Sequence, residues 1–177
     1  GFDRGNKTIH PNGTFEQRLN YNANGRPATI VSRKDHPSAP VHRFKTDFTY
    51  DEANRVKTKV VTNDGVVTTT TMTYDLAGRI TNVNLSGAGF GTGNYQYFYD
   101  TVGRFYKEQY PDSKAVVHVL DANGNITKTT YPDGTYFVER VYDQLDRLTD
   151  IKLNGAVTSA VQFQYDQLSR RKKLIYE

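Results

Sequence analysis

The residues able to do chemistry are few in this sequence, and their spacing builds no evident reactive site. The four histidines stand at positions 10, 36, 42 and 118, and the nearest pair, His36 and His42, flanks a proline-rich turn. Zinc sites use closely spaced His, Cys or carboxylate ligands, and that spacing is missing here. A Gly-x-Ser-x-Gly nucleophile elbow is also missing, whereas a Ser-His-Asp triad has no fixed order along a chain, so the sequence leaves it open. We expect a protein that is not an enzyme and that has no metal or cofactor.

One segment is similar to half of a calcium-binding loop. It reads Asp121-Ala122-Asn123-Gly124-Asn125, with oxygen-bearing side chains at alternate positions. The bidentate Glu that closes such a loop is missing, and the segment is in register with a turn that recurs along the chain. We therefore interpret it as a structural turn.

The composition favours a β protein. Only 36% of the residues are hydrophobic, and the aromatic residues are 13 Tyr and 9 Phe with no Trp. Tyr, Phe, Val and Thr suit a half-buried pleated sheet, and no ten-residue window has the sustained apolar period of a helix. The lack of cysteine excludes disulfides and thiolate sites. No apolar run reaches the length of about eighteen residues that a membrane-spanning helix needs.

The positive net charge does not predict a nucleic-acid partner. The net charge is +4, but much of the basicity is spread as one Arg per repeat, usually beside an Asp, and the only dense cluster is Arg170-Arg171-Lys172-Lys173. A surface that binds nucleic acid needs a basic patch or stripe. We expect no nucleic-acid binding.

A Tyr-Asp-x-x-Gly-Arg motif recurs along the chain and decides its organisation. Positions 21 to 165 contain six intervals over 144 residues, a mean period of 24. We predict one array of about seven repeats over residues 1–177, as part of a longer protein. The motifs begin at positions 21, 50, 74, 99, 120, 142 and 165, and their signature residues are Tyr21, Gly25 and Arg26; Tyr50, Asp51 and Arg55; Tyr74, Asp75, Gly78 and Arg79; Tyr99, Asp100, Gly103 and Arg104; Asp121 and Gly124; Tyr142, Asp143 and Arg147; and Tyr165, Asp166 and Arg170.

The motif predicts a specific hairpin turn. The Asp carboxylate can accept a hydrogen bond from the backbone two residues on. Gly at the fourth position of the turn that begins at Asp suits a type I turn followed by a left-handed residue, which makes a three-residue loop with a bulge. Asn54 and Asp146 are the next-best residues for that conformation, and Ser169 fits less well, so its turn is expected to be looser. Between the motifs stands a second kind of turn, such as Asn63-Asp64-Gly65, Pro132-Asp133-Gly134 and Asn154-Gly155.

The strands that enter these turns alternate between apolar and polar residues, and the motif Tyr falls on the apolar face. Phe44, Phe48 and Tyr50 share one face, as do Val161, Phe163 and Tyr165. A single hairpin is marginally stable in water, so each repeat must bury this face against its neighbours. We predict an all-β fold of tandem hairpins stacked into one long, curved, spiralling antiparallel sheet.

These repeats resemble the YD-repeat, or Rhs (rearrangement hot spot), family, from Phe2 to Tyr176, through the motif at 74–79 and 99–104 and its diverged copies. In that family, long arrays form a shell. The shell encloses a toxic C-terminal domain in bacterial Rhs proteins and in the C components of Tc toxins, and related shells occur in teneurins. Two features of the family have no match here: the Asp-Pro-rich autoproteolytic core and a toxin domain after the repeats. The resemblance implies one strip of a shell wall, with neighbouring repeats and an enclosed toxin as its partners.

A carbohydrate- or cell-surface-binding repeat is the alternative function. Contiguous exposed aromatic residues usually mark a partner site, and the candidates are Phe98, Phe105 and Phe137, which we expect on the face opposite the motif tyrosines. A choline- or glucan-binding solenoid is disfavoured because its ligand cages rely on Trp. Open sheet edges predict edge-to-edge self-association. We expect a secreted or cell-surface bacterial protein whose targeting signal lies outside this chain.

Overall fold

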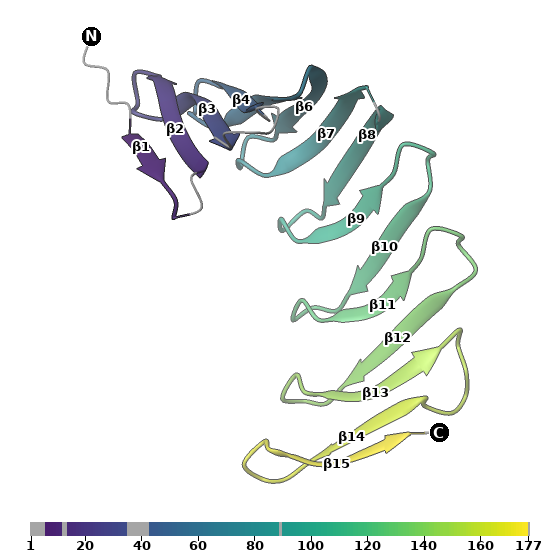
Figure 1. The fold of residues 1–177 in the computed structure, drawn as a ribbon. Helices are drawn as coiled ribbons and strands as arrows, with labels where there is room; N and C mark the ends of the chain where they lie inside the picture. Colours follow the sequence, from purple (N-terminus) through teal and green to yellow (C-terminus); the bar gives the residue numbers. More distant parts are fainter. Residues whose placement is uncertain (1–5, 12–13, 35–42, 89, 177) are drawn as a thin grey trace. The chain divides into compact units, whose positions relative to one another are not determined.

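A computed structural model describes residues 6–11, 14–34, 43–88 and 90–176, and its strands form one antiparallel sheet (Figure 1). The strand order follows the chain from β1 to β15, so successive strands pair as hairpins and β1 and β15 are the two edges. This confirms the predicted all-β sheet of sequential hairpins. The strands are β1 (Asn6–Ile9), β2 (Thr14–Tyr21), β3 (Pro27–Lys34), β4 (Arg43–Tyr50), β5 (Val56–Asn63), β6 (Val66–Tyr74), β7 (Ile80–Gly87), β8 (Phe90–Tyr99), β9 (Phe105–Gln109), β10 (Ala115–Leu120), β11 (Ile126–Thr130), β12 (Phe137–Tyr142), β13 (Leu148–Leu153), β14 (Val161–Tyr165) and β15 (Arg171–Tyr176).

The chain divides into two compact units, Gly1–Asn94 and Tyr95–Glu177. The first unit contains β1 to β7 with the start of β8, and the second contains the end of β8 and the strands that follow. No helix within the described residues is long and apolar enough to cross a membrane.

The signature turns have the predicted geometry in all seven motifs. At Asp100 the backbone N–H bonds to the Arg104 carbonyl at 2.9 Å, and the Gly103 N–H bonds to the Asp100 carbonyl at 2.9 Å. This pattern is a type I turn closed by a left-handed residue. The fourth residue of the turn that begins at the motif Asp has positive φ in every motif: Gly25 (76°), Asn54 (62°), Gly78 (83°), Gly103 (90°), Gly124 (95°), Asp146 (58°) and Ser169 (59°). The Ser169 turn keeps both hydrogen bonds, at 2.9 and 3.0 Å, so the looser turn expected there is not found.

The turns at the other end of the hairpins are of two kinds rather than one. Asp64-Gly65 is a two-residue turn between β5 and β6 with positive φ at both positions, as in a type I′ hairpin. Asn154-Gly155 also has positive φ at both positions, but it begins a longer loop, because β13 ends at Leu153 and β14 begins at Val161. The turn at Pro111-Asp112-Ser113 instead repeats the geometry of the signature turn, because the Ser113 N–H bonds to the Tyr110 carbonyl at 3.0 Å and Ser113 has a φ of 68°. The predicted turns at 12–13 and 36–40 lie outside the described residues.

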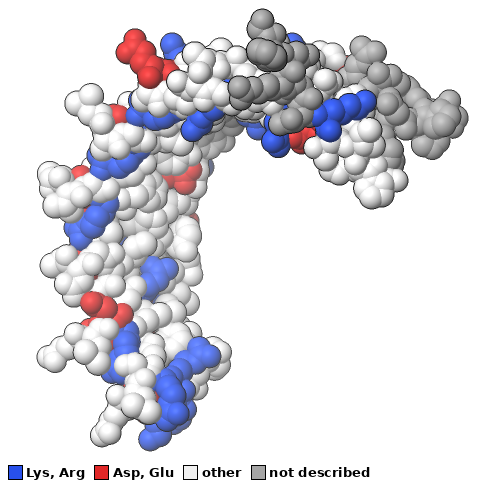
Figure 2. Space-filling view, turned by 90° about the vertical axis from the view of Figure 1, so that its left-hand side faces the viewer, with Lys and Arg blue, Asp and Glu red and all other residues white. Residues whose placement is uncertain are grey.

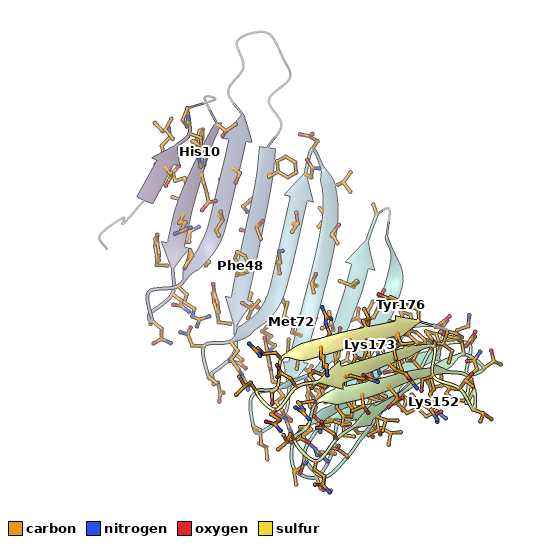
Figure 3. All side chains as sticks on the ribbon, turned by 90° about the horizontal axis from the view of Figure 1, so that it is seen from below. His10, Phe48, Met72, Lys152, Lys173 and Tyr176 are labelled. Carbon is orange, nitrogen blue, oxygen red and sulfur yellow. The ribbon has the colours of Figure 1, made fainter. Side chains whose placement is uncertain are left out.

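The two faces of the sheet differ in character within the first unit. The tyrosine face, defined as the face that carries the motif tyrosines, holds Phe48 and Tyr50 on β4, their neighbour Val61 on β5, and Met72 and Tyr74 on β6 (Figure 3). The opposite face of these strands is rich in threonine: Thr49, Thr58, Thr69, Thr71 and Thr73. This confirms that Phe44, Phe48 and Tyr50 share the apolar face.

Burial is shallow because the sheet is a single layer. Among the described residues Val138 is the only buried hydrophobic side chain, and Thr29, Thr129 and Ser159 are the buried polar ones. Most strand side chains are half-buried. Contacts between adjacent hairpins must therefore supply most of the packing.

The left-handed fourth position predicts a position-specific cost. Gly78→Ala should lower the free energy of unfolding by about 1–2 kcal/mol, because a Cβ is unfavourable at positive φ, although an added Cβ would meet nothing closer than Arg55 Nη1 at 3.5 Å. Urea unfolding followed by circular dichroism measures the change. Ala77→Ser, one residue earlier in the same turn, is the control and should have little effect. Equal effects of the two substitutions would contradict the assignment.

Candidate functional site

The motif Asp and Arg form a clamp within each turn. In the motif at Tyr142, Asp143 Oδ1 accepts the backbone N–H of Leu145 at 2.9 Å and of Arg147 at 3.0 Å. The second oxygen, Oδ2, accepts Arg147 Nε at 2.7 Å and Nη2 at 2.6 Å. One carboxylate therefore closes the backbone loop and fixes the arginine. The same clamp joins Asp51 to Arg55, Asp75 to Arg79, Asp100 to Arg104 and Asp166 to Arg170, with Nε to Oδ2 distances of 2.7 to 2.8 Å.

The charges of the motifs are therefore paired locally. Figure 2 shows several basic side chains beside acidic ones on the face that it presents, together with basic groups that have no acidic neighbour in this view. The Arg170–Lys173 cluster is also divided, because Arg170 clamps Asp166, Arg171 pairs with Tyr165 on the tyrosine face, and Lys173 pairs with Gln164 on the opposite face.

The clamps lower the pKa of their aspartates. At Asp143 the hydrogen bond from the Arg147 guanidinium is the largest cause, and it outweighs the partial desolvation that would raise the pKa. At Asp75, Asp100 and Asp166 the backbone N–H of the motif arginine is the largest cause of the lowered pKa. Hydrogen bonds to the charged form stabilise it. These carboxylates are held ionised as acceptors, which does not suit them to act as general acids.

The motif tyrosine reaches back to the preceding repeat. Its hydroxyl donates to the backbone carbonyl of the residue that directly follows the preceding motif. This contact recurs from Tyr50 to Pro27 at 2.7 Å, from Tyr74 to Val56 at 2.7 Å, from Tyr142 to Ile126 at 3.2 Å and from Tyr165 to Leu148 at 2.8 Å. A buried tyrosine usually finds such a partner for its hydroxyl, and here the partner always belongs to the neighbouring hairpin.

The motif arginine reaches forward to the next repeat. The guanidinium carbon of Arg55 lies 4.4 Å from the centre of the Tyr74 ring, and that of Arg147 lies 4.7 Å from the Tyr165 ring, as in cation–π contacts. The remaining nitrogen, Nη1, donates to the backbone of the next motif. It reaches the Asp75 carbonyl at 3.5 Å from Arg55, the Asp121 carbonyl at 2.7 Å from Arg104 and the Asp166 carbonyl at 3.5 Å from Arg147.

Together these contacts form the joint between neighbouring repeats, defined as the contacts of the motif tyrosine with the repeat before it and of the motif arginine with the repeat after it. The exposed fractions of the arginine side chains show the effect of the joint. The Arg147 side chain, which has a following motif over it, is 24% exposed, whereas that of Arg170, the last motif arginine of this sequence, is 74% exposed. The tyrosine of the following repeat therefore covers the arginine before it. The tyrosines do contact the adjacent copy, as the stacking of repeats requires.

The fifth motif lacks both halves of the joint and uses a different contact. It has Leu120 in place of Tyr and Asn125 in place of Arg. Asn125 Nδ2 donates to Asp121 Oδ2 at 3.0 Å and to Asp146 Oδ1 at 2.7 Å, and Asn123 Nδ2 also reaches Asp146 at 2.8 Å. The Asp121 carboxylate is thus engaged within its turn, in line with its interpretation as a structural turn.

Sequence reasoning missed the role of the fourth turn position, where the motif has Gly. Each non-glycine residue there accepts a hydrogen bond from the preceding repeat: Asn54 from Asn22 at 2.9 Å, Asp146 from Asn123 and Asn125, and Ser169 from Arg147 at 3.1 Å. The signal was present, because these three motifs depart from glycine only towards side chains that can accept a hydrogen bond.

Tyr21, Tyr99 and Arg26 are the signature residues not yet described. Tyr21 and Tyr99 are half-buried, and the guanidinium carbon of Arg26 lies 5.8 Å from the centre of the Tyr50 ring. Asn22, which stands in place of the motif Asp, still accepts the Arg26 N–H at 2.9 Å.

The aromatic candidates for a ligand surface do not share one face. Phe98 and Phe137 lie opposite the tyrosine face, with lysine ammonium groups 4.7 Å and 3.5 Å from their ring centres, from Lys107 and Lys128. Phe105 was expected there too, but it pairs with Tyr99, and the two rings are 5.9 Å apart on the tyrosine face. A bulge just after Phe105 shifts the register and reverses the alternation.

Histidines and acids do not gather into a metal site in the described parts of the chain. His10 is exposed (Figure 3), and His118 lies on β10 in the second unit. The pair His36 and His42 lies outside the described residues.

The fold and the joint define a repeat protein of the YD type, in which the tyrosine and arginine of successive motifs fasten neighbouring hairpins. The teneurin YD-shell family matches residues 4–138, and the chain belongs to this family. That finding confirms the resemblance drawn from the motif.

Solved structures share the fold at low sequence identity. The crystal structure of TcdB2-TccC3-TEV matches with a TM-score of 0.72 and 15% identity over 93% of this chain. Those of TcdB2-TccC3-Cdc42 and of TcdB2-TccC3 without its hypervariable C-terminal region match with TM-scores of 0.68 and 0.69, both at 14% identity over 89%. This chain spans 9% of the length of each of these chains. A comparison with curated proteins finds no match.

The tyrosine hydroxyl predicts a measurable share of the joint's stability. Tyr165→Phe removes the hydrogen bond to the Leu148 carbonyl and should lower the free energy of unfolding by about 0.5–1.5 kcal/mol. The matched control is Tyr176→Phe, because Tyr176 is 71% exposed on the edge strand β15 (Figure 3). Chemical denaturation of both variants decides the point, and an equal loss in the two would refute the role of the hydroxyl.

The clamps predict a loss of stability in acid. The pKa of Asp143 is lower in the folded chain than its ordinary value of 3.8. Its contribution is therefore complete above that ordinary value and disappears as pH falls through the folded pKa. Asp143→Asn keeps the backbone acceptor, as Asn22 does in the first motif, but loses the ion pair. Between about pH 5 and pH 2 the variant should lose less stability than the parent chain, and parallel acid titrations that show the same loss would contradict the assignment.

Proposed function

We propose that this chain is a structural segment of a shell wall that encloses or displays a toxin or effector domain. The joint is the observation that carries the proposal, because it fastens neighbouring hairpins through the Tyr and Arg side chains of the motif, with contacts from Asn123 and Asn125 to Asp146 in its place after the fifth motif. Membership of the teneurin YD-shell family and the fold shared with TccC3-containing structures support it. In this role the Asp–Arg clamps are mechanical, and the wall needs no catalytic group or cofactor.

The described region is too small to be a container by itself. Its sheet is a single layer with free edges at β1 and β15, and it spans 9% of the chains that share its fold. We infer that neighbouring repeats of a longer protein continue the sheet at these edges. The enclosed domain is then a second partner. The proposed setting is a secreted or cell-surface protein of a bacterium.

The glycan-binding alternative gains no support from the aromatic candidates. A lysine ammonium already lies over the rings of Phe98 and Phe137, and Phe105 stands on the other face. The three rings therefore do not form one contiguous platform on which a sugar chain could stack.

Protection of the enclosed domain from protease tests the proposal. The parent protein, with the segments that its gene places on either side of this chain, would be treated with trypsin before and after mild denaturation. A downstream domain that resists trypsin in the folded parent and is digested once the wall is opened supports enclosure. A domain cut as fast in the folded parent as in isolation, or a parent with no domain besides the repeats, would overturn it.

A paired variant connects protection to the joint. In the parent protein, Arg147→Ala combined with Tyr165→Ala should loosen one joint and speed digestion of the enclosed domain. The conservative Tyr176→Phe is the control and should leave protection unchanged. A double variant with normal protection and reduced unfolding stability would separate the joint from the enclosing role.

A further inference from the structure

Arg140 is a charged residue on the tyrosine face that takes no part in the joint between repeats. It lies on β12, half-buried, two residues from the buried Val138 and on the same face. Its Nη1 donates to Thr129 Oγ1 on β11 at 2.9 Å. Within the described residues no carboxylate forms an ion pair with it, in contrast to the clamped motif arginines. Partial burial of a positive charge that has no carboxylate partner costs free energy.

A short chain of polar groups runs from Arg140 across two strands. Thr129 is 5% exposed, and its hydroxyl lies 3.1 Å from His118 Nδ1 on β10. A buried hydroxyl that accepts from a guanidinium satisfies its own proton by donating it, and His118 Nδ1 is the acceptor beside it. On this reasoning we assign the ring proton of His118 to Nε2. Burial, followed by the charge of Arg140, lowers the pKa of His118 and keeps the ring neutral.

Arg140 and His118 together present N–H donors, and no carboxylate among the described residues forms an ion pair with Arg140. The guanidinium keeps Nε and Nη2 for a ligand, and His118 adds Nε2–H. The acids on the surrounding strands are engaged elsewhere. Glu108 on β9 interacts with Tyr97, Glu139 on β12 pairs with Lys128 on the opposite face at 3.8 Å, and Asp150 on β13 accepts from Ser159 at 2.7 Å.

The surroundings of these donors are apolar. Phe105, 37% exposed, places its ring 5.9 Å from that of His118. Val138 lies beside Thr129 as its cross-strand partner, and Ile151 is the partner of Arg140 on β13. The donors thus lie among an aromatic ring and aliphatic side chains on one face of the sheet.

We propose that Arg140 and His118 form a carboxylate-binding site for a Glu or Asp side chain of a polypeptide segment that lies on the tyrosine face. A guanidinium binds a carboxylate through two parallel N–H bonds, and one guanidinium with a neutral imidazole matches a single negative charge better than a doubly charged phosphate. The apolar surroundings suit hydrophobic residues that flank the acid. This inference concerns the face of the sheet and does not depend on whether the segment belongs to an enclosed toxin.

A titration with short capped peptides tests the site. Acetyl-Leu-Glu-Leu-amide would be added to the isotope-labelled chain while the side-chain NMR signals of Arg140 Nε and His118 are followed. The expected result is a saturable shift of both signals that the Gln peptide, acetyl-Leu-Gln-Leu-amide, does not cause. Arg140→Gln should weaken binding about tenfold or more, and Arg171→Gln, also on the tyrosine face, should leave it unchanged.

Each other outcome overturns the proposal or its ligand class. Equal binding of the Glu and Gln peptides, or unchanged binding by the Arg140→Gln variant, would remove the carboxylate site. Galacturonate and inorganic phosphate are parallel probes, and tighter binding of either one than of the Glu peptide would overturn the polypeptide ligand. Circular dichroism of the Arg140→Gln variant checks that it keeps the sheet, and Arg140→Lys, which retains the charge without the paired donors, should bind more weakly than the parent chain.

Discussion

A single-layer sheet has no enclosed hydrophobic core, so contacts between neighbouring hairpins must supply the stability that a core would give. In this chain that contact centres on the motif arginine, which is held by its own aspartate and lies against the tyrosine of the next repeat. The tyrosine returns a hydrogen bond to the backbone beside that arginine. Because both residues belong to the repeated motif, a hairpin that carries the full motif brings the groups that fasten it to its neighbours. Stability then grows along the array as a sum of nearest-neighbour contacts.

The clamp reduces the conformational entropy that the motif arginine loses when it contacts the next repeat. A free arginine side chain loses considerable conformational freedom on binding, and exposed ion pairs contribute little by themselves. Here the Asp143 carboxylate accepts two backbone N–H groups as well as the guanidinium, so the turn and the arginine are ordered together. The guanidinium can then meet the next ring and carbonyl with its geometry already set. The main effect of the Asp–Arg ion pair is therefore to orient the guanidinium, rather than to stabilise the fold by its own electrostatic attraction.

Much of this could be predicted from the sequence, because it depends on local rules. Period-two alternation indicated the strands and the face of Tyr50, and Gly103 at the fourth position indicated its left-handed turn. Contacts between repeats were beyond such rules. The partner of Arg147 lies about one period away, and no local pattern gives its distance or direction. Phe105 was misplaced for a related reason: the bulge beside it reverses the alternation, and a bulge is set by pairing with the neighbouring strand.

The diverged motifs indicate what the joint requires. At the Gly124 turn Arg104 Nη1 lies 2.7 Å from the Asp121 carbonyl, whereas at the Gly78 turn Arg55 Nη1 lies 3.5 Å from the Asp75 carbonyl, so glycine at the fourth turn position does not by itself set this distance. Where a side chain stands there at positive φ, it carries conformational strain, and in this chain each such side chain accepts a hydrogen bond from the preceding repeat that offsets the strain. Asp146 is the clearest case, because it receives Asn125, the residue that replaces the missing arginine. A substitution in one motif is therefore accompanied by a side chain in the neighbouring motif that restores a hydrogen bond between them. This is expected if the structural constraint acts on the contact between repeats rather than on the individual hairpin.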